Sequence, residues 1–127
     1  MNNRPFLQPE ISEATIKLGN YLISSEPYVR YARAEQSMDN DDEVRSLMPR
    51  LAEAQERVRK AQVRGTIIAD DLQALSELQL QVKASPVIKD YNASQQELAK
   101  FLQEINTEIS QLLGINFALI AHHSSCC

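Results

Sequence analysis

The chain has 127 residues, which is the length of a single domain. Hydrophobic residues make up 43% and can form a core, whereas three glycines, five prolines and 6% aromatic residues are too few for the turns of an all-β fold. Thirteen basic residues against seventeen acidic ones give a net charge of −4. Domains that read DNA sequence are usually basic, so this class is disfavoured.

Signals for membranes and secretion are missing from the sequence. No apolar run approaches the roughly 18 residues that span a bilayer, and the first residues lack the apolar core of a signal peptide. We therefore expect a cytoplasmic protein that does not associate with a membrane. The two cysteines, Cys126 and Cys127, are adjacent at the end of the sequence, which excludes a disulfide framework.

The first third of the chain predicts a leader and two helices. Residues 1–9 are expected to be a flexible leader, after which apolar residues recur at helical spacing over 10–24. Ser25 then offers a side chain that can cap the free amides of a second helix, and Pro27 is tolerated in the first turn of that helix.

The clearest break in the pattern is the acidic stretch 39–43. Carboxylates are favourable at the start of a helix, where free amides and the helix dipole attract negative charge. A third helix is predicted over 42–64, and Gly65 ends it. Pro49 lies inside this helix, so that either Pro49 kinks it or the helix begins near Leu47.

Two further helices follow. Asp70 is predicted to cap the fourth, over 71–83, which is apolar on more than one face and should pack against two partners. A Ser–Pro signal starts the fifth helix, over 86–113, and Gly114 ends it. The remaining residues, 114–127, are first apolar and then contain histidine and cysteine.

These elements predict an all-α fold, an elongated helical hairpin or bundle of about five helices that forms one domain over residues 10–113. Apolar residues in the third and fifth helices step by seven, which is the spacing of coiled coils. Because long paired helices with few aromatic residues bury little within one chain, we expect a homo-oligomer. A monomeric antiparallel bundle is the alternative.

The long helices also supply candidate interaction residues. A seven-residue row on the fifth helix is expected to face sister subunits and consists of Tyr91, Leu98, Ile105 and Leu112. A basic row on the third helix could meet RNA phosphates or an acidic partner and consists of Arg50, Arg57 and Arg64. The alternative for the basic row is ordinary pairing along the helix, between Glu53 and Arg57 and between Glu56 and Lys60.

Residue types that support catalysis are scarce. The sequence has no glycine-rich phosphate loop, and both histidines lie in the tail, away from any paired acid and base. We therefore expect a protein that is not an enzyme.

The tail carries the one set of metal-ligand residue types, His122, His123, Cys126 and Cys127. Thiolates and imidazoles bind zinc and iron, but adjacent cysteines are strained on one metal. Cys126 and Cys127 could therefore ligate a metal or an iron–sulfur cluster shared with other chains and act as a redox sensor. The alternative is a tail with inert thiols.

Several segments of the sequence together resemble the YlbF/YmcA family. They are Leu18–Glu35, the acidic stretch that follows with Val44–Leu47, and Ser85–Tyr91 leading into the last long helix. The resemblance covers about residues 10–113.

The resemblance implies an all-helical, non-enzymatic regulator that self-associates. Family members assemble with each other and with a partner called YaaT, in a complex linked to competence, sporulation and biofilm control and to ribonuclease Y. Some members carry C-terminal cysteines that help to bind iron–sulfur clusters. In this chain that role falls on Cys126 and Cys127, an adjacent pair where the family usually has more widely spaced cysteines.

Overall fold

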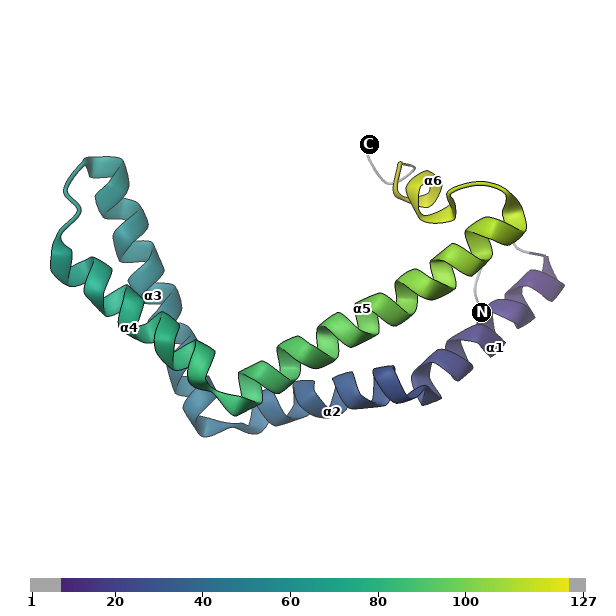
Figure 1. Ribbon diagram of the computed structural model, residues 1–127, viewed down its shortest axis with the longest axis horizontal. Coiled ribbons are helices and arrows are strands. Elements are labelled where there is room, and N and C mark those ends of the chain that lie inside the picture. Colours follow the sequence, from purple (N-terminus) through teal and green to yellow (C-terminus); the bar gives the residue numbers. More distant parts are fainter. Residues whose placement is uncertain (1–7, 124–127) are drawn as a thin grey trace.

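The computed structural model describes residues 8–123 and consists of helices joined by short connections (Figure 1). Within this range it contains no strand, so the predicted all-α class is confirmed. The described residues form six helices rather than about five. They are α1 (Pro9–Ser24), α2 (Glu26–Asn40), α3 (Asp42–Arg64), α4 (Ala69–Ala84), α5 (Pro86–Leu113) and α6 (Phe117–His123).

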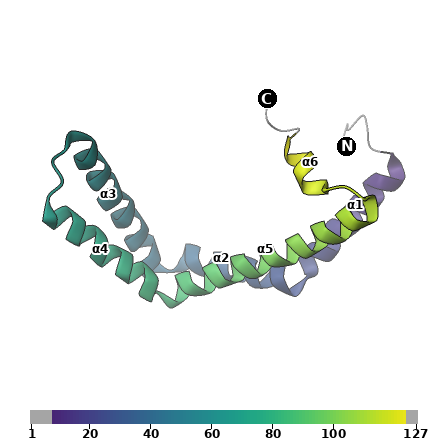
Figure 2. The ribbon, with the colours of Figure 1, turned by 45° about the horizontal axis from the view of Figure 1, so that its top comes forward.

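The helices form a bent hairpin with two legs, as expected for an elongated molecule. In one leg α3 packs against α4, and in the other α2 packs against α5 (Figures 1 and 2). The legs meet where α2 passes into α3 and α4 passes into α5, so that both sides of the hairpin change direction at one level. No helix within residues 8–123 is long and apolar enough to cross a membrane.

Two side-chain caps fix this bend. The carboxylate of Asp41 accepts a hydrogen bond from the Val44 amide at 2.9 Å and starts α3. The Ser85 hydroxyl oxygen accepts one from the Ile88 amide at 3.3 Å and starts α5. The Ser85 cap and the acidic start of α3 agree with the sequence prediction, and each cap satisfies an amide that the first helical turn leaves free.

The buried apolar residues cluster around the bend and along the α3–α4 leg. Val44 and Ile88, whose amides the two caps hold, are both buried. They form one cluster with Leu47, Ala54 and Leu78. The hairpin is therefore anchored where its legs join.

Two predicted helix starts differ in detail. Ser25 does not cap α2, because its hydroxyl donates a hydrogen bond back to the Leu22 carbonyl at 2.6 Å and satisfies the end of α1 instead. The fourth helix begins at Ala69, so that Asp70 lies in its first turn rather than at the cap. Its charge still lies near the positive end of the helix dipole.

The third helix begins at the earlier of the two predicted positions. It begins at Asp42, so a start near Leu47 is wrong, and Pro49 lies inside a continuous helix. Pro49 has no amide to donate to the preceding turn, which removes one backbone hydrogen bond. Gly65 and Gly114 end α3 and α5 with φ of 69° and 70°, as predicted, because glycine tolerates this left-handed conformation.

The α2–α5 leg is held by polar contacts beside small buried residues. The hydroxyls of Tyr31 and Tyr91 lie 3.2 Å apart, with ring centroids 5.6 Å apart. This hydrogen bond, together with desolvation, raises the pKa of Tyr31 to about 12. One turn beyond each tyrosine, Ala34 and Ser94 are buried. Arg30 also bridges the helices by pairing with Glu97.

Candidate interaction surface

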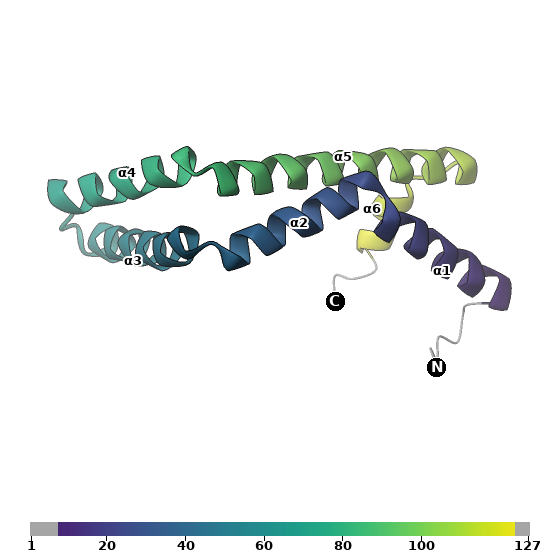
Figure 3. The ribbon, with the colours of Figure 1, turned by 90° about the horizontal axis from the view of Figure 1, so that it is seen from below.

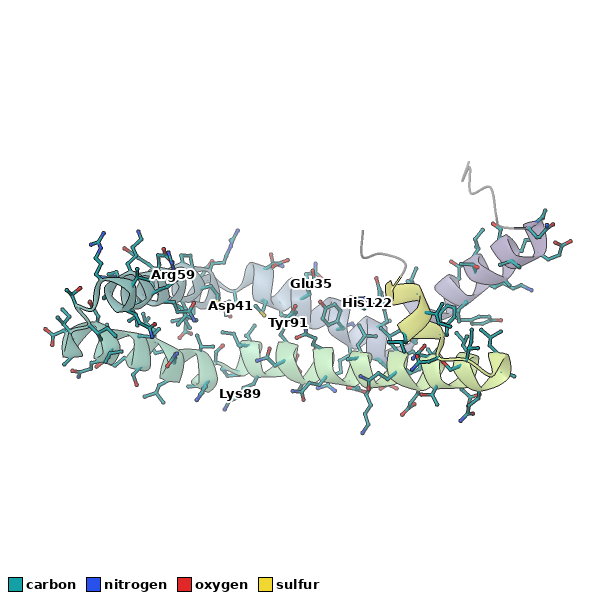
Figure 4. All side chains as sticks on the ribbon, turned by 90° about the horizontal axis from the view of Figure 1, so that it is seen from above. Glu35, Asp41, Arg59, Lys89, Tyr91 and His122 are labelled. Atoms are coloured by element: carbon teal, nitrogen blue, oxygen red, sulfur yellow. The ribbon has the colours of Figure 1, made fainter. Side chains whose placement is uncertain are left out.

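The predicted interaction row on α5 becomes more exposed toward the end of the helix. Tyr91 is half-buried and points toward α2, where it meets Tyr31 (Figure 4). Leu98 and Ile105 are also half-buried, but Leu112 is 85% exposed. The helix α2 therefore covers only the first part of this row.

The helix α1 continues this cover only over its last residues, where Gly19, Leu22 and Ile23 line a cavity with α5. It points away from α5 (Figure 3), and its main packing partner is α2, which follows it in the chain. None of its residues is buried. The break at Ser25, whose backbone is extended, and Pro27 in the next turn set α1 out of line with α2.

The result is an apolar surface at one end of the molecule, which we call the open end and define as α1, the second half of α5, and α6 with the connection before it. Its large exposed apolar side chains are Ile11, Ile16, Leu18, Tyr21, Ile23, Leu102, Leu112, Leu113, Ile115, Phe117, Leu119 and Ile120. Exposed apolar side chains that gather at one end of a molecule are typical of sites where proteins bind one another.

Two hollows lie on the open end. A cavity of about 300 Å³ is almost wholly apolar, and its lining residues are Gly19, Leu22, Ile23, Tyr28, Leu98, Phe101 and Leu102. A shallower hollow of about 680 Å³ runs along one face of α5 between Lys100 and Gln111 and includes Phe101 and Ile105. The apolar cavity lies between α1, the start of α2 and α5, whereas residues of α5 alone line the larger hollow.

The short helix α6 was not predicted from the sequence. Its start is fixed by Asn116, whose side-chain oxygen accepts a hydrogen bond from the Leu119 amide at 3.1 Å. The Ser110 hydroxyl oxygen accepts another from the Phe117 amide at 3.1 Å, which ties α6 to α5. A helix-ending glycine followed by a capping asparagine and five apolar residues was the signal for it.

The predicted basic row lies on the other leg and is mixed with acidic residues. Arg50 and Arg57 line a groove of about 330 Å³ between α3 and α4 together with Glu53 and Glu77. Arg64 lies at the end of α3 and does not line this groove. The two carboxylates make the groove less favourable for a nucleic-acid phosphate.

Ion pairing on α3 differs partly from the expected pattern. Glu56 lies 2.5 Å from Arg59, which Figure 4 labels, and 4.0 Å from Lys60. The hydrogen bond from Arg59 lowers the pKa of the Glu56 carboxyl. The pair of Glu56 and Lys60 was predicted. The expected pair of Glu53 and Arg57 does not form, and the side chains of Glu53 and Arg57 are exposed.

The fourth helix also has an open face. It packs against α3 and, where the legs join, against α5, but Leu80 is 62% exposed and Leu72 is 47% exposed. The helix therefore has two partners, as predicted, but within one chain they leave part of its apolar surface uncovered. Its second apolar face is left uncovered because the other leg bends away from it.

The structure does not show the predicted metal ligands together, because only some of them belong to the described part of the chain. Cys126 and Cys127 lie outside the described residues, and His122 lies on α6 (Figure 4). Between residues 8 and 123 no three histidine, cysteine, aspartate or glutamate side chains are grouped so as to hold a metal ion.

These features define a class of protein, an elongated two-legged helical hairpin with a large apolar surface left open at one end. Residues 11–113 match the sequence model of the family described as control of competence regulator ComK, YlbF/YmcA. The chain belongs to this family, and the resemblance predicted over residues 10–113 is confirmed.

Two individual proteins are similar to the chain. A UPF0342 protein of Caldicellulosiruptor saccharolyticus is 21% identical over 106 residues, which cover 83% of this chain and 88% of the relative. A chain in the crystal structure of Bacillus subtilis RicA in complex with RicF has a TM-score of 0.73 at 16% identity, covering 85% of this chain and 96% of that one. At this identity the second similarity concerns the fold.

Proposed function

We propose that the chain is a regulatory protein without enzymatic activity that acts by binding other proteins through the open end. The observation that carries this proposal is the apolar surface of α1, α5 and α6, which the chain itself leaves uncovered. Membership in a family of competence regulators supports it. The occurrence of the same fold in a complex between RicA and RicF also supports it.

The proposed partners are a second copy of the chain and sister members of the same family, in the cytoplasm. We further propose that such an assembly modulates RNA processing by ribonuclease Y, together with a YaaT-like protein. This part follows from the family resemblance. In this mechanism the chain contributes a docking surface, and the chemistry on RNA belongs to the nuclease.

A complementation experiment tests this function. In the native host, the gene is deleted and replaced by the wild type, by Leu112→Asp at the open end, or by Leu80→Asp on the other leg as a control. We expect the deletion to change the 5′ ends of ribonuclease Y-processed transcripts, Leu80→Asp to restore them, and Leu112→Asp to fail at equal protein level. Unchanged transcript ends in the deletion strain would refute the link to ribonuclease Y.

A shared iron–sulfur cluster is a second proposal, which rests on the residue types in the tail. Cys126 and Cys127 would supply two thiolates, and because a cluster usually takes four, other chains must supply the rest. Anaerobic purification followed by visible absorption and iron analysis tests it, with a Cys126→Ser/Cys127→Ser variant as control. Iron in equal amounts in both preparations would count against the cysteines as ligands.

A further inference from the structure

The apolar cavity at the open end lies in the wedge between α1 and α5. The helices α2 and α5 pack side by side, and at Ser25 the chain turns so that α1 diverges from α5 (Figure 3). The last residues of α1 still face α5 close to this turn, and the cavity of about 300 Å³ lies between them. This volume is at the lower limit of sites that bind small molecules.

The lining of the cavity is apolar on all sides. Its half-buried residues are Leu22, Leu98 and Phe101, and those at the exposed opening are Ile23, Tyr28 and Leu102. Among the side chains that line the cavity, only that of Tyr28 has a polar atom. Because an ordered water molecule needs about two to four polar partners, water in this cavity is weakly held and an apolar group displaces it readily.

Gly19 is an independent sign that this space is left open. It lies inside α1 without the positive φ of Gly65 and Gly114, so no turn requires a glycine there. A Cβ atom added at Gly19 would meet no atom within 4 Å outside its own turns of the helix, so close packing does not require a glycine either. Glycine inside a helix is unfavourable relative to alanine. Its missing side chain instead enlarges the cavity that Gly19 lines.

We propose that this cavity binds the hydrocarbon chain of a small amphiphile, such as a fatty acyl chain, with the polar head group at the opening. Apolar cavities of about 150 Å³ take up small apolar molecules, so this larger one can hold a flexible chain. No charged side chain lines the cavity. A polar head group would lose its hydration inside without gaining a partner, and therefore stays in the solvent.

A bound chain would supply packing that α1 lacks. The helix has 16 residues, none of them buried, and isolated helices of about this length are only marginally stable in water. A hydrocarbon chain between Leu22 of α1 and Leu98 of α5 would hold the two helices together without a partner protein. The orientation of α1, and with it the surface of the open end, would then depend on the ligand.

Titration of the full-length chain with octanoate, below its micelle concentration, tests the site. Side-chain methyl groups are followed by NMR, and we expect saturating shifts at the cavity residues Leu22, Ile23 and Leu98. The exposed apolar residues Ile115 and Leu119 lie outside the cavity and should show none. Equal shifts in both sets would show contact with apolar surface in general and would overturn the inference, as would the absence of any shift.

Filling the cavity gives a matched comparison. Gly19→Ala should weaken octanoate binding about fourfold and Gly19→Leu about tenfold or more, because the added groups take the place of methylene groups of the ligand. Asn20→Leu is the control, since Asn20 lines a separate hollow on α1 with Lys17 and Ser24, and should bind octanoate as the wild type does. Circular dichroism checks that each variant is folded. Undiminished binding in both Gly19 variants would overturn the inference.

Two further measurements identify the occupant. Dihexanoyl phosphatidylcholine, also below its micelle concentration, replaces octanoate in the titration. Shifts with the phospholipid alone would support the site and identify a membrane lipid as the source, and shifts with octanoate alone would support it and identify a free fatty acid. If the cavity methyl groups shift when the chain is concentrated without ligand, a second copy fills the cavity and the inference is wrong.

The site and the proposed function can fail separately, since the titration needs only the purified chain. If octanoate binds but deletion of the gene leaves the transcripts unchanged, the cavity stands as a binding site and the regulatory function is wrong. If octanoate does not bind but Leu112→Asp still fails to complement the deletion, only the ligand site is wrong.

Discussion

The bend and the open end are built from similar helices but differ in how far they are completed by their own chain. At the bend, two side-chain caps and a cluster of buried apolar residues hold four helix ends together. At the open end, α1 has no buried residue and Leu112 is 85% exposed. The bend therefore determines the shape of the subunit, whereas the open end leaves its apolar side chains available for other proteins.

Truncating a buried side chain at the bend should cost far more stability than truncating an exposed one on the same helix. Leu47, which is 3% exposed at the bend, should lose about 2–5 kcal/mol of unfolding free energy when changed to alanine, because a cavity remains. Val63, which is 77% exposed on α3, should lose no more than about 0.5 kcal/mol on the same truncation. Urea unfolding followed by circular dichroism measures both, and equal losses would contradict a core confined to buried positions.

The next effect concerns association rather than folding. Leu112→Asp should leave the helical content unchanged but weaken self-association roughly 10- to 100-fold, the equivalent of losing the burial of one leucine. Light scattering over a dilution series measures this. Leu80→Asp on α4 serves as the control, and a similar weakening there would show that α4 rather than the open end holds the subunits together.

A smaller effect tests the caps at the bend. Asp41→Ala should cost about 1 kcal/mol, because the Val44 amide loses its acceptor. Asp70→Ala provides the comparison, since Asp70 lies in the first turn of α4 without the cap position and should cost about 0.5 kcal/mol or less. If urea unfolding gives the two variants equal stability, the Asp41 cap stabilises the bend no more than a carboxylate elsewhere in a first helical turn.

The smallest effect concerns the ionisation of Tyr31 in the α2–α5 leg. The pKa of Tyr31 is about 12, so ultraviolet absorption should show a tyrosine ionisation step near pH 12. In Tyr91→Phe the partner hydroxyl is gone, so this late step should shift toward 10. Because folding favours the protonated hydroxyl, its stabilisation is present below pH 10 and is lost as the pH rises toward 12. An unchanged titration in Tyr91→Phe would refute the hydroxyl contact.

Sequence alone predicted the features that depend on short-range signals. The five long helices, the stop at Gly65, the acidic start of α3 and the Ser–Pro start of α5 follow from residues within one turn of each helix end. The family match over residues 11–113 was also predicted.

Features that depend on three-dimensional direction were not predicted. The side chain of Ser25 could satisfy either of two helix ends, and only the structure shows that it bonds to Leu22. The turn of α1 away from α5 depends on the backbone angles at that break, which residue types leave open. The row that ends at Leu112 was predicted to be apolar. For the same reason, the sequence did not predict that its cover ends halfway along the helix.

Because the two caps lie at the same point along the hairpin, they restrict how the length of this molecule can change in evolution. Asp41 and Ser85 start helices on opposite sides of the hairpin, and the buried cluster lies directly behind them. Adding a residue to α2 alone would move one cap past the other and rotate every later side chain of α3 by about 100° relative to α4. We therefore expect the legs to grow or shorten only by matched changes in both of their helices, and the distance from the bend to the open end to change only when α2 and α5 change together.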